Sequence, residues 1–404
     1  MSLAARKNNI PTVDLGSISG ASISGGEKTN GAYVDFVEFV IDSSLGVGVW
    51  PGNPNPGDMV LRTVEEVLVP DNFYAYYGWG DGTSDYSTST GFEVFHTYDT
   101  QTNYTIRLLT NGYLSYGATN NRSGAGKVIE VNRFGEKTNW AGTLSQLIAG
   151  SASPVTINPS DNIPPSLRSV INMFSSAVNF NWGGFNQWDW TSPYLDSLSS
   201  FLKNTNYNLP ITIVTSNIVS IEDALAGTPY DGSGMSGWDV SSITTFSDAF
   251  AGSDVDADLS SWDVSNVTSF NIAFSNSSNF QGTGVDGWNV SSANNLSGAF
   301  LNCPLFTGDI SGWTFKNGAQ FSNIISECPL VTDAEVALFV EGWDSNPNQG
   351  TGCVSVGWCS LSGSPRTLSE STYPNAKVAH DNLKDSVANG GKGWVLVNDI
   401  TWVA

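Results

Sequence analysis

The chain has 404 residues and a formal net charge of −22, from 38 acidic and 16 basic side chains. A surface of this sign repels phosphate backbones and anionic lipid headgroups, so we expect neither nucleic-acid binding nor membrane binding. Charged residues are only 13% of the chain, and the abundance of Gly, Ser, Asn and Thr is typical of β-structure with many turns. No apolar run is long enough to cross a bilayer, so we expect no membrane insertion.

Residues 1–30 are small, polar and rich in Gly, and their two basic residues are not followed by the apolar core of a signal peptide. The segment has too few large apolar side chains to order itself. We therefore predict that residues 1–30 form an arm that anchors the protein to other chains of an assembly.

Residues 31–118 contain five stretches rich in β-branched and aromatic residues, with turn signals such as PGNPNPGD between them. This pattern predicts a β-sheet domain. The stretches read YVDFVEFVI, MVLRTVEEVLV, NFYAYYGWG, FEVFHTYD and NYTIRLLTNGYLSYG.

Two of these segments, GWGDGTSDY and HTYDTQTNYTIRL, resemble the PKD domain, an immunoglobulin-like β-sandwich. The glycines beside Asp81 permit a tight turn with positive φ. Asp81 then either accepts hydrogen bonds within that turn or belongs to a small ion site. The matching residues are Trp79, Gly80, Asp81, Gly82, Thr83, His96, Tyr98 and Tyr104.

Residues 119–330 repeat one pattern every 23 to 28 residues. In the nine residues that end each copy, the second, fifth and ninth are small or apolar, as Val267, Phe270 and Phe274 illustrate. Offsets of three and seven place such residues on one face of a helical turn. The copies end at Ile148, Phe174, Leu202, Leu225, Phe250, Phe274, Phe300 and Ile325.

A tryptophan lies twelve residues before the end of four copies: Trp238, Trp262, Trp288 and Trp313. Around it, apolar and polar residues alternate with the period of a strand. One copy therefore predicts a short strand, a turn and a short helix, which buries its apolar face only when stacked on its neighbours. We expect a parallel stack with the four tryptophans in one column.

The pattern W-D-V-S-N-V-T-x-F, followed by an Ala-Phe or Met-Phe ending, resembles the BspA-like leucine-rich-repeat surface proteins. The copies ending at Phe250, Phe274 and Phe300 match best, and in the copy ending at Leu225 the Trp position is Ile213. Together with the PKD-like part, the resemblance covers roughly residues 72–330. It implies a right-handed solenoid, a role in adhesion or surface display, and no catalysis.

After Leu330 the repeat lapses, and residues 331–404 predict a cap over the last open core. DAEVALFVEGW and AKVAHDNLKDSV have helical spacing, and GWVLVNDITWV has strand character. The expected fold is therefore mainly β with short helices: an N-terminal β-sandwich, then a leucine-rich-repeat-type right-handed solenoid of about eight coils, then the cap.

The four cysteines are too few for a disulfide scaffold, and we expect no metal and no cofactor. Cys303 and Cys328 occupy matching places in their copies, as two buried thiols or as a disulfide, and Cys353 and Cys359 flank a short loop that an oxidised pair would bridge. The acidic segment Asp254–Asp258 opens like a calcium loop, but the twelfth position is Ser265. We therefore interpret it as a solvated loop.

No catalytic motif accompanies the two histidines, His96 and His380, and we predict that the protein is not an enzyme. What remains is surface, and the loops before each tryptophan differ most between copies. One aromatic segment, NWGGFNQWDW, has residues suited to stacking on sugars or anchoring a protein. Alternatively, Trp188 or Trp190 fills the core position of the repeat's tryptophan and the other aromatic residues pack the edge of the coil. The candidate ligand-binding residues are Trp182, Phe185 and Trp188.

The sequence favours a virion surface protein of a bacteriophage: a tail fibre, a tail-tip adhesin or a capsid decoration protein. Such a protein would join other virion proteins through residues 1–30 and bind a glycan or protein on the host surface. Because the sequence shows no signal peptide before this adhesion fold, we expect the protein to leave the cell as part of the assembled virion. The alternatives are a BspA-like bacterial cell-surface adhesin and, third, a glycan-active enzyme on a solenoid. Head or tail location, receptor, oligomeric state and copy number do not follow from the sequence.

Overall fold

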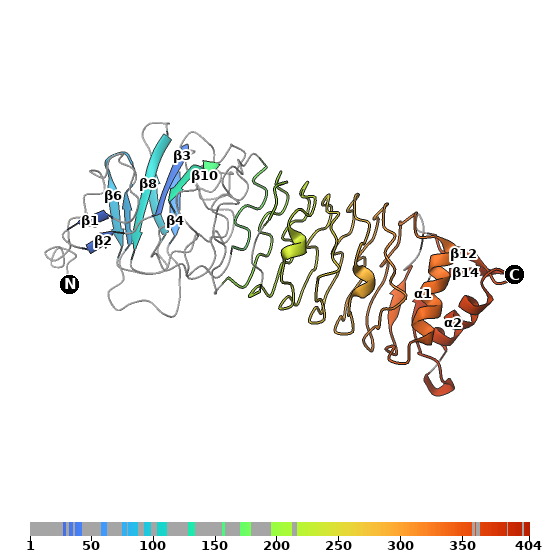
Figure 1. The fold of residues 1–404 in the computed structure, drawn as a ribbon. Helices are drawn as coiled ribbons and strands as arrows, with labels where there is room; N and C mark the ends of the chain where they lie inside the picture. The colour runs from blue at the N-terminus through green and yellow to red at the C-terminus, as the bar shows by residue number, and fades with distance from the viewer. Residues whose placement is uncertain are drawn as a thin grey trace.

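The computed structural model arranges the chain from an N-terminal group of strands, through a stack of coils, to two helices near the C-terminus (Figure 1). It describes residues 170–178, 195–211, 216–357, 360, 364–385, 387–397 and 400–404. In the N-terminal part it describes strands β1 to β10 and the turn 80–83.

The N-terminal strands form a six-stranded sheet in the order β10-β9-β3-β8-β5-β6, with β1-β2 and β4-β7 as separate pairs. All of these strands pair antiparallel except β9 with β10. Strands occur in each of the five expected stretches, and β9 and β10 extend the sheet beyond residue 118. The bounds are β1 Glu27–Thr29, β2 Ala32–Val34, β3 Val37–Asp42, β4 Asp58–Arg62, β5 Ala75–Gly78, β6 Ser84–Ser87, β7 Glu93–Thr97, β8 Asn103–Thr110, β9 Val128–Arg133 and β10 Thr156–Ile157.

The tight turn expected around Asp81 is present between β5 and β6. Gly80 and Gly82 have φ values of 82° and 92°. The Asp81 carboxylate accepts hydrogen bonds from the Thr83 amide at 2.9 Å and from its hydroxyl at 2.6 Å. A Cβ on Gly80 would lie 2.6 Å from the carbonyl oxygen of Thr105, so the turn needs glycine there for space as well as for φ.

Successive copies of the repeat stack in parallel, with one bridging residue per coil. Hydrogen bonds between coils occur at every second residue: Phe250 N–H donates to the Ala273 carbonyl at 2.8 Å, and Gly252 N–H to that of Ser275 at 2.7 Å. Each coil therefore satisfies the backbone of its neighbour. The parallel column runs through Ser197, Ser220, Thr245, Ser269, Asn295, Gln320 and Val354.

The short helix expected in each copy is not formed in the described coils, and this corrects the local prediction. The helical offsets do identify the core, since Val267, Phe270 and Phe274 are all buried. The backbone between them instead makes turns, with Asp248 and Gly252 at positive φ in the preceding coil. A helix of nine residues is marginal by itself, whereas here alternate N–H groups bond to the next coil.

The expected strand around each tryptophan is also absent. Trp262 and Val264 are buried and Asp263 is exposed, so the alternation correctly predicts burial. The bridge to the next coil forms five residues beyond Val264, at Ser269. Alternating burial therefore marks the core face here without a hydrogen-bonded ladder.

The four tryptophans lie in one column, as the repeat spacing predicts. Their ring centroids are 6.1, 6.4 and 6.3 Å apart, and the rings are stacked with interplanar angles of 4° to 12°. Each indole N–H donates to a backbone carbonyl of the preceding coil, at 2.9 to 3.4 Å. The donor and acceptor pairs are Trp238 with Ile211, Trp262 with Met235, Trp288 with Leu259 and Trp313 with Val285.

Three residues after the end residue of six successive copies, from the copy ending at Leu202 to the one ending at Ile325, a hydroxyl or thiol is buried. Ser277 donates to the Phe250 carbonyl at 2.8 Å, and Cys303 to that of Phe274 at 3.0 Å. Cys303, Cys328 and Cys353 are free thiols, and Cys359 lies outside the described residues. Burial raises the pKa of Cys328 to about 12 and that of Cys353 to about 11, so both thiols are neutral at physiological pH.

The expected terminal helices and strands are confirmed. A capping box between Thr332 and Glu335 starts α1, and Pro374 starts α2. Trp343 on α1 donates its indole N–H to the Ile310 carbonyl at 2.8 Å, which continues the hydrogen-bonding pattern of the column tryptophans by one position. The bounds are α1 Asp333–Ser345, β11 Val354–Val356, β12 Arg366–Ser369, α2 Pro374–Lys384, η6 Val387–Asn389, β13 Val395–Val397 and β14 Ile400–Val403.

Helices in the described part of the chain are all too short or too polar to cross a bilayer.

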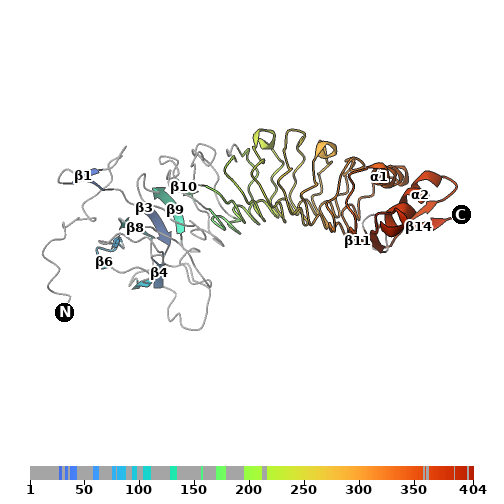
Figure 2. The same ribbon diagram turned by 90° about the horizontal axis from the view of Figure 1, so that it is seen from below.

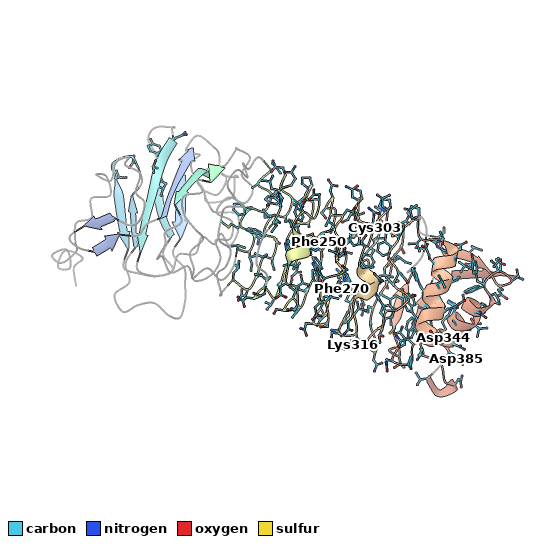
Figure 3. The ribbon with its side chains drawn as sticks, viewed as in Figure 1. Phe250, Phe270, Cys303, Lys316, Asp344 and Asp385 are labelled. Carbon is cyan, nitrogen blue, oxygen red and sulfur yellow. The ribbon has the colours of Figure 1, made fainter. Side chains whose placement is uncertain are left out.

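We expect Phe270→Ala to lower the free energy of unfolding by about 3–5 kcal/mol, because it leaves a cavity between coils. Phe270 lies within the stack (Figure 3), its ring 5.6 Å from Phe246 and 5.5 Å from Trp288. Denaturant melts measure the loss. Val219→Ala, at an exposed position, is the control. A loss below about 1 kcal/mol would show that Phe270 does not support the stack.

Candidate functional site

The aromatic residues proposed from the sequence, Trp182, Phe185 and Trp188, lie outside the described residues. His96 is in β7, and nothing is described of its side chain. His380 is buried on α2, with its ring 5.7 Å from that of Trp402. The described structure therefore directs attention to the loops before each tryptophan.

Two of these loops carry a single turn of 3-10 helix, η4 at Met235–Gly237 and η5 at Val285–Gly287. Both turns lie on the same side of the stack (Figure 2). Gly234 and Gly284, the residues before them, have φ values of 91° and 88°. The loop 253–261 of the coil between them has neither glycine nor a 3-10 turn. Loops with a 3-10 turn thus flank a loop without one.

A cavity of 540 Å³ lies among these loops, and we call it the loop groove. Ligand sites of small molecules have volumes in this range. Its walls come from four successive coils, which no single stretch of sequence would reveal. The lining residues are Asp231, Gly232, Ser233, Ser236, Asp254, Asp256, Ala257, Asp258, Asn279, Gln281 and Leu305.

The carboxylates of the groove are held by hydrogen bonds from neighbouring residues. The Asp256 carboxylate accepts a hydrogen bond from the side-chain amide of Gln281, in the next coil, at 2.7 Å. Asp254 accepts from the Ser278 hydroxyl at 3.5 Å. Hydrogen bonds from the backbone and the hydroxyl of Ser260 lower the pKa of Asp258, so this exposed carboxylate is ionised at neutral pH.

The groove is rich in hydrogen-bond acceptors, with four aspartates and no Lys, Arg or His in its lining. It therefore repels anionic groups and matches ligands that donate hydrogen bonds, such as hydroxyl-rich or amine-bearing molecules. Asp254, Asp256 and Asp258 come from the segment that opens like a calcium loop. Within the described residues no three His, Cys, Asp or Glu side chains are grouped to hold a metal ion.

A second acidic group lies where Asp248 and Asp223 occupy matching positions of adjacent coils. Burial and the charge of Asp223 raise the pKa of Asp248. Lys203 bonds to Asp223 at 2.7 Å and offsets part of this repulsion. This group lies among the turns of the coil and outside the groove lining.

The comparisons with known proteins give one family and no individual relative. The family model of a Mycoplasma protein of unknown function, DUF285, matches residues 219–335. No curated protein and no solved structure matches the chain. The matched range contains the tryptophan column and the whole loop groove.

We expect Gly284→Ala to destabilise the protein by about 1–3 kcal/mol, because its backbone is in the left-handed region. Its new Cβ would also meet the backbone of Ser260 in the preceding coil. Gly287→Ala is the matched control, since a Cβ there meets no atom within 4 Å. Thermal melts compare the two variants. Equal stability would show that the loop does not depend on the left-handed backbone of Gly284 or on its close approach to Ser260.

Proposed function

We propose that this chain is a non-enzymatic surface protein of a bacteriophage particle and that it recognises its host through the loop groove. The observation that carries the proposal is the position of the groove. Loops that differ between copies line it, while the core below repeats with little change. Such a division lets a surface change its ligand without loss of the fold.

The polarity of the groove supports a donor-rich ligand on the host surface. Asp256 and Gln281 orient each other, which leaves further lone pairs of the carboxylate available to a ligand. Sugar hydroxyls and amino groups are the donors that cell surfaces present in quantity. A glycan is therefore the ligand class we favour, in agreement with the sequence-based expectation of a host-surface glycan or protein.

We also propose that the stack is a solenoid of the leucine-rich-repeat type that resembles the BspA-like surface proteins. The stacked tryptophans and the parallel bridges support a solenoid. The PKD-like β-sandwich before it rests on the Asp81 turn and the antiparallel strands.

A bacterial cell-surface adhesin is the second candidate, and the family match favours it. The matching family is described from Mycoplasma, a cellular organism, and the match covers the repeats themselves. Both candidates use the same groove for recognition. Mass spectrometry of purified phage particles separates them, because only the first places this chain in the particle.

We expect Asp256→Lys to weaken binding of the full chain to host cells by about tenfold, since a charged hydrogen-bond partner contributes about 1.5 kcal/mol or more. Asp263→Lys is the matched control: Asp263 is also exposed and also accepts a hydrogen bond, but it lies outside the groove. Binding of labelled protein to intact cells measures the effect. Equal binding by both variants would place the recognition surface elsewhere.

We expect deletion of residues 1–30 to leave a soluble, folded protein that no longer joins its particle. The segment has few large apolar residues with which to build a core of its own, so we expect it to pack against another chain. Only Glu27–Thr29 of this segment is described, as β1. Quantitative mass spectrometry of particles measures incorporation, and circular dichroism checks the fold. Normal incorporation of the truncated chain would place the anchor in another part of the protein.

A further inference from the structure

The last strands of the chain leave two open edges at the same end of the stack. β11 bridges to Gln320 on one side and pairs with β13 on the other, so β13 is the outermost strand of its column. β12 pairs with β14, while Arg366 of β12 bonds back to the Val331 carbonyl of the last coil. No described strand pairs with the outer edge of β13 or of β14. β14 and the C-terminus lie at the end of the molecule away from β1 (Figure 2).

Among the residues that the structure describes, nothing gives these two edges the usual protection of terminal strands. Proteins protect open edges with lysine, proline, bulges or a covering segment, because unpaired N–H and C=O groups recruit another strand. β13 reads VLV and β14 reads ITWV, with no charged residue and no proline. Val395, Val397 and Val403 are 50%, 43% and 44% exposed on these strands.

The charge of the chain also changes at this end. Residues 195–330 contain thirteen acidic and two basic residues. Electrostatic repulsion between these coils therefore disfavours side-by-side association of two copies of the chain. Residues 364–404 contain four of each, so the side chains of this end carry no net charge. The residues are Glu370, Asp381, Asp385 and Asp399 against Arg366, Lys377, Lys384 and Lys392.

We propose that two copies of this chain dock end to end through β13 and β14. Both edges belong to one end, so a two-fold axis across that end would pair β13 with β13 and β14 with β14 of the second copy. Both pairings would be antiparallel and would form together, whereas a single foreign strand would cover one edge. Such a self-complementary contact is the commonest way in which soluble chains form dimers. This inference does not depend on the proposed recognition of a host.

The test is the mass of the full chain in solution, measured by sedimentation equilibrium at micromolar concentration. We expect about twice the 43.0 kDa of one chain. The double variant Val395→Lys, Val397→Lys should raise the dissociation constant at least about tenfold, because it places charges on an edge that must pair. The matched control is Val178→Lys, Val219→Lys, at valine positions exposed on other coils and outside the loop groove.

A monomeric wild-type chain, or a dimer equally weakened by both double variants, would overturn the proposal. Circular dichroism of the variants separates loss of pairing from loss of fold. Should the lysine variant fail to fold, the single variants Val397→Cys and Val219→Cys replace it. Under mild oxidation we expect a covalent dimer of the full chain from Val397→Cys only. Its absence would equally refute the end-to-end arrangement.

Discussion

The hydrogen bonds between successive coils are the interaction on which the rest of the described structure depends. Every second backbone N–H around Phe250 donates to the next coil, and each column tryptophan donates to the preceding one. A coil by itself would leave these groups unpaired and its aromatic face exposed. Because an unpaired buried polar group is costly, each coil is stable only between neighbours. The first and last coils therefore need other elements to cover their open faces.

At the C-terminal end the last coil is covered by helix α1 instead of another coil. Trp343 on α1 donates to Ile310, three residues before Trp313, as the column tryptophans do one coil earlier. Phe315 and Phe321 then pack against both Trp343 and Trp394. The helix thereby covers the last aromatic layer of the repeat. Beyond this helix, β13 and β14 again present edges that no described strand pairs with.

The same division between constant core and variable loops defines the loop groove. Within the loop from Ser253 to Ser261 only Ser253, Val255 and Leu259 are buried, so the other positions of this loop are free to vary without disturbing the core. This loop lines the groove together with residues of the preceding coil, including Ser236 of η4, and of the two following coils. The charge of the groove follows from the aspartates of one short segment, reinforced by Asp231 of the preceding coil. A surface of this kind suits the proposed recognition of donor-rich ligands.

The sequence by itself determined the repeat, its core residues, the tryptophan column and the positions of α1 and α2. Periodicity reports which side chains are buried, and a helix with its own caps is specified locally. The tertiary structure alone decided how each coil satisfies its backbone, since the apolar offsets of Val267, Phe270 and Phe274 suit both a helix and a stacked turn. It also decided that four coils share one groove, that Trp343 continues the hydrogen-bonding pattern of the column tryptophans, and that the open edges of β13 and β14 lie at the same end of the stack. These features depend on which residues of different coils meet, and a pattern within one coil holds no information about its neighbour.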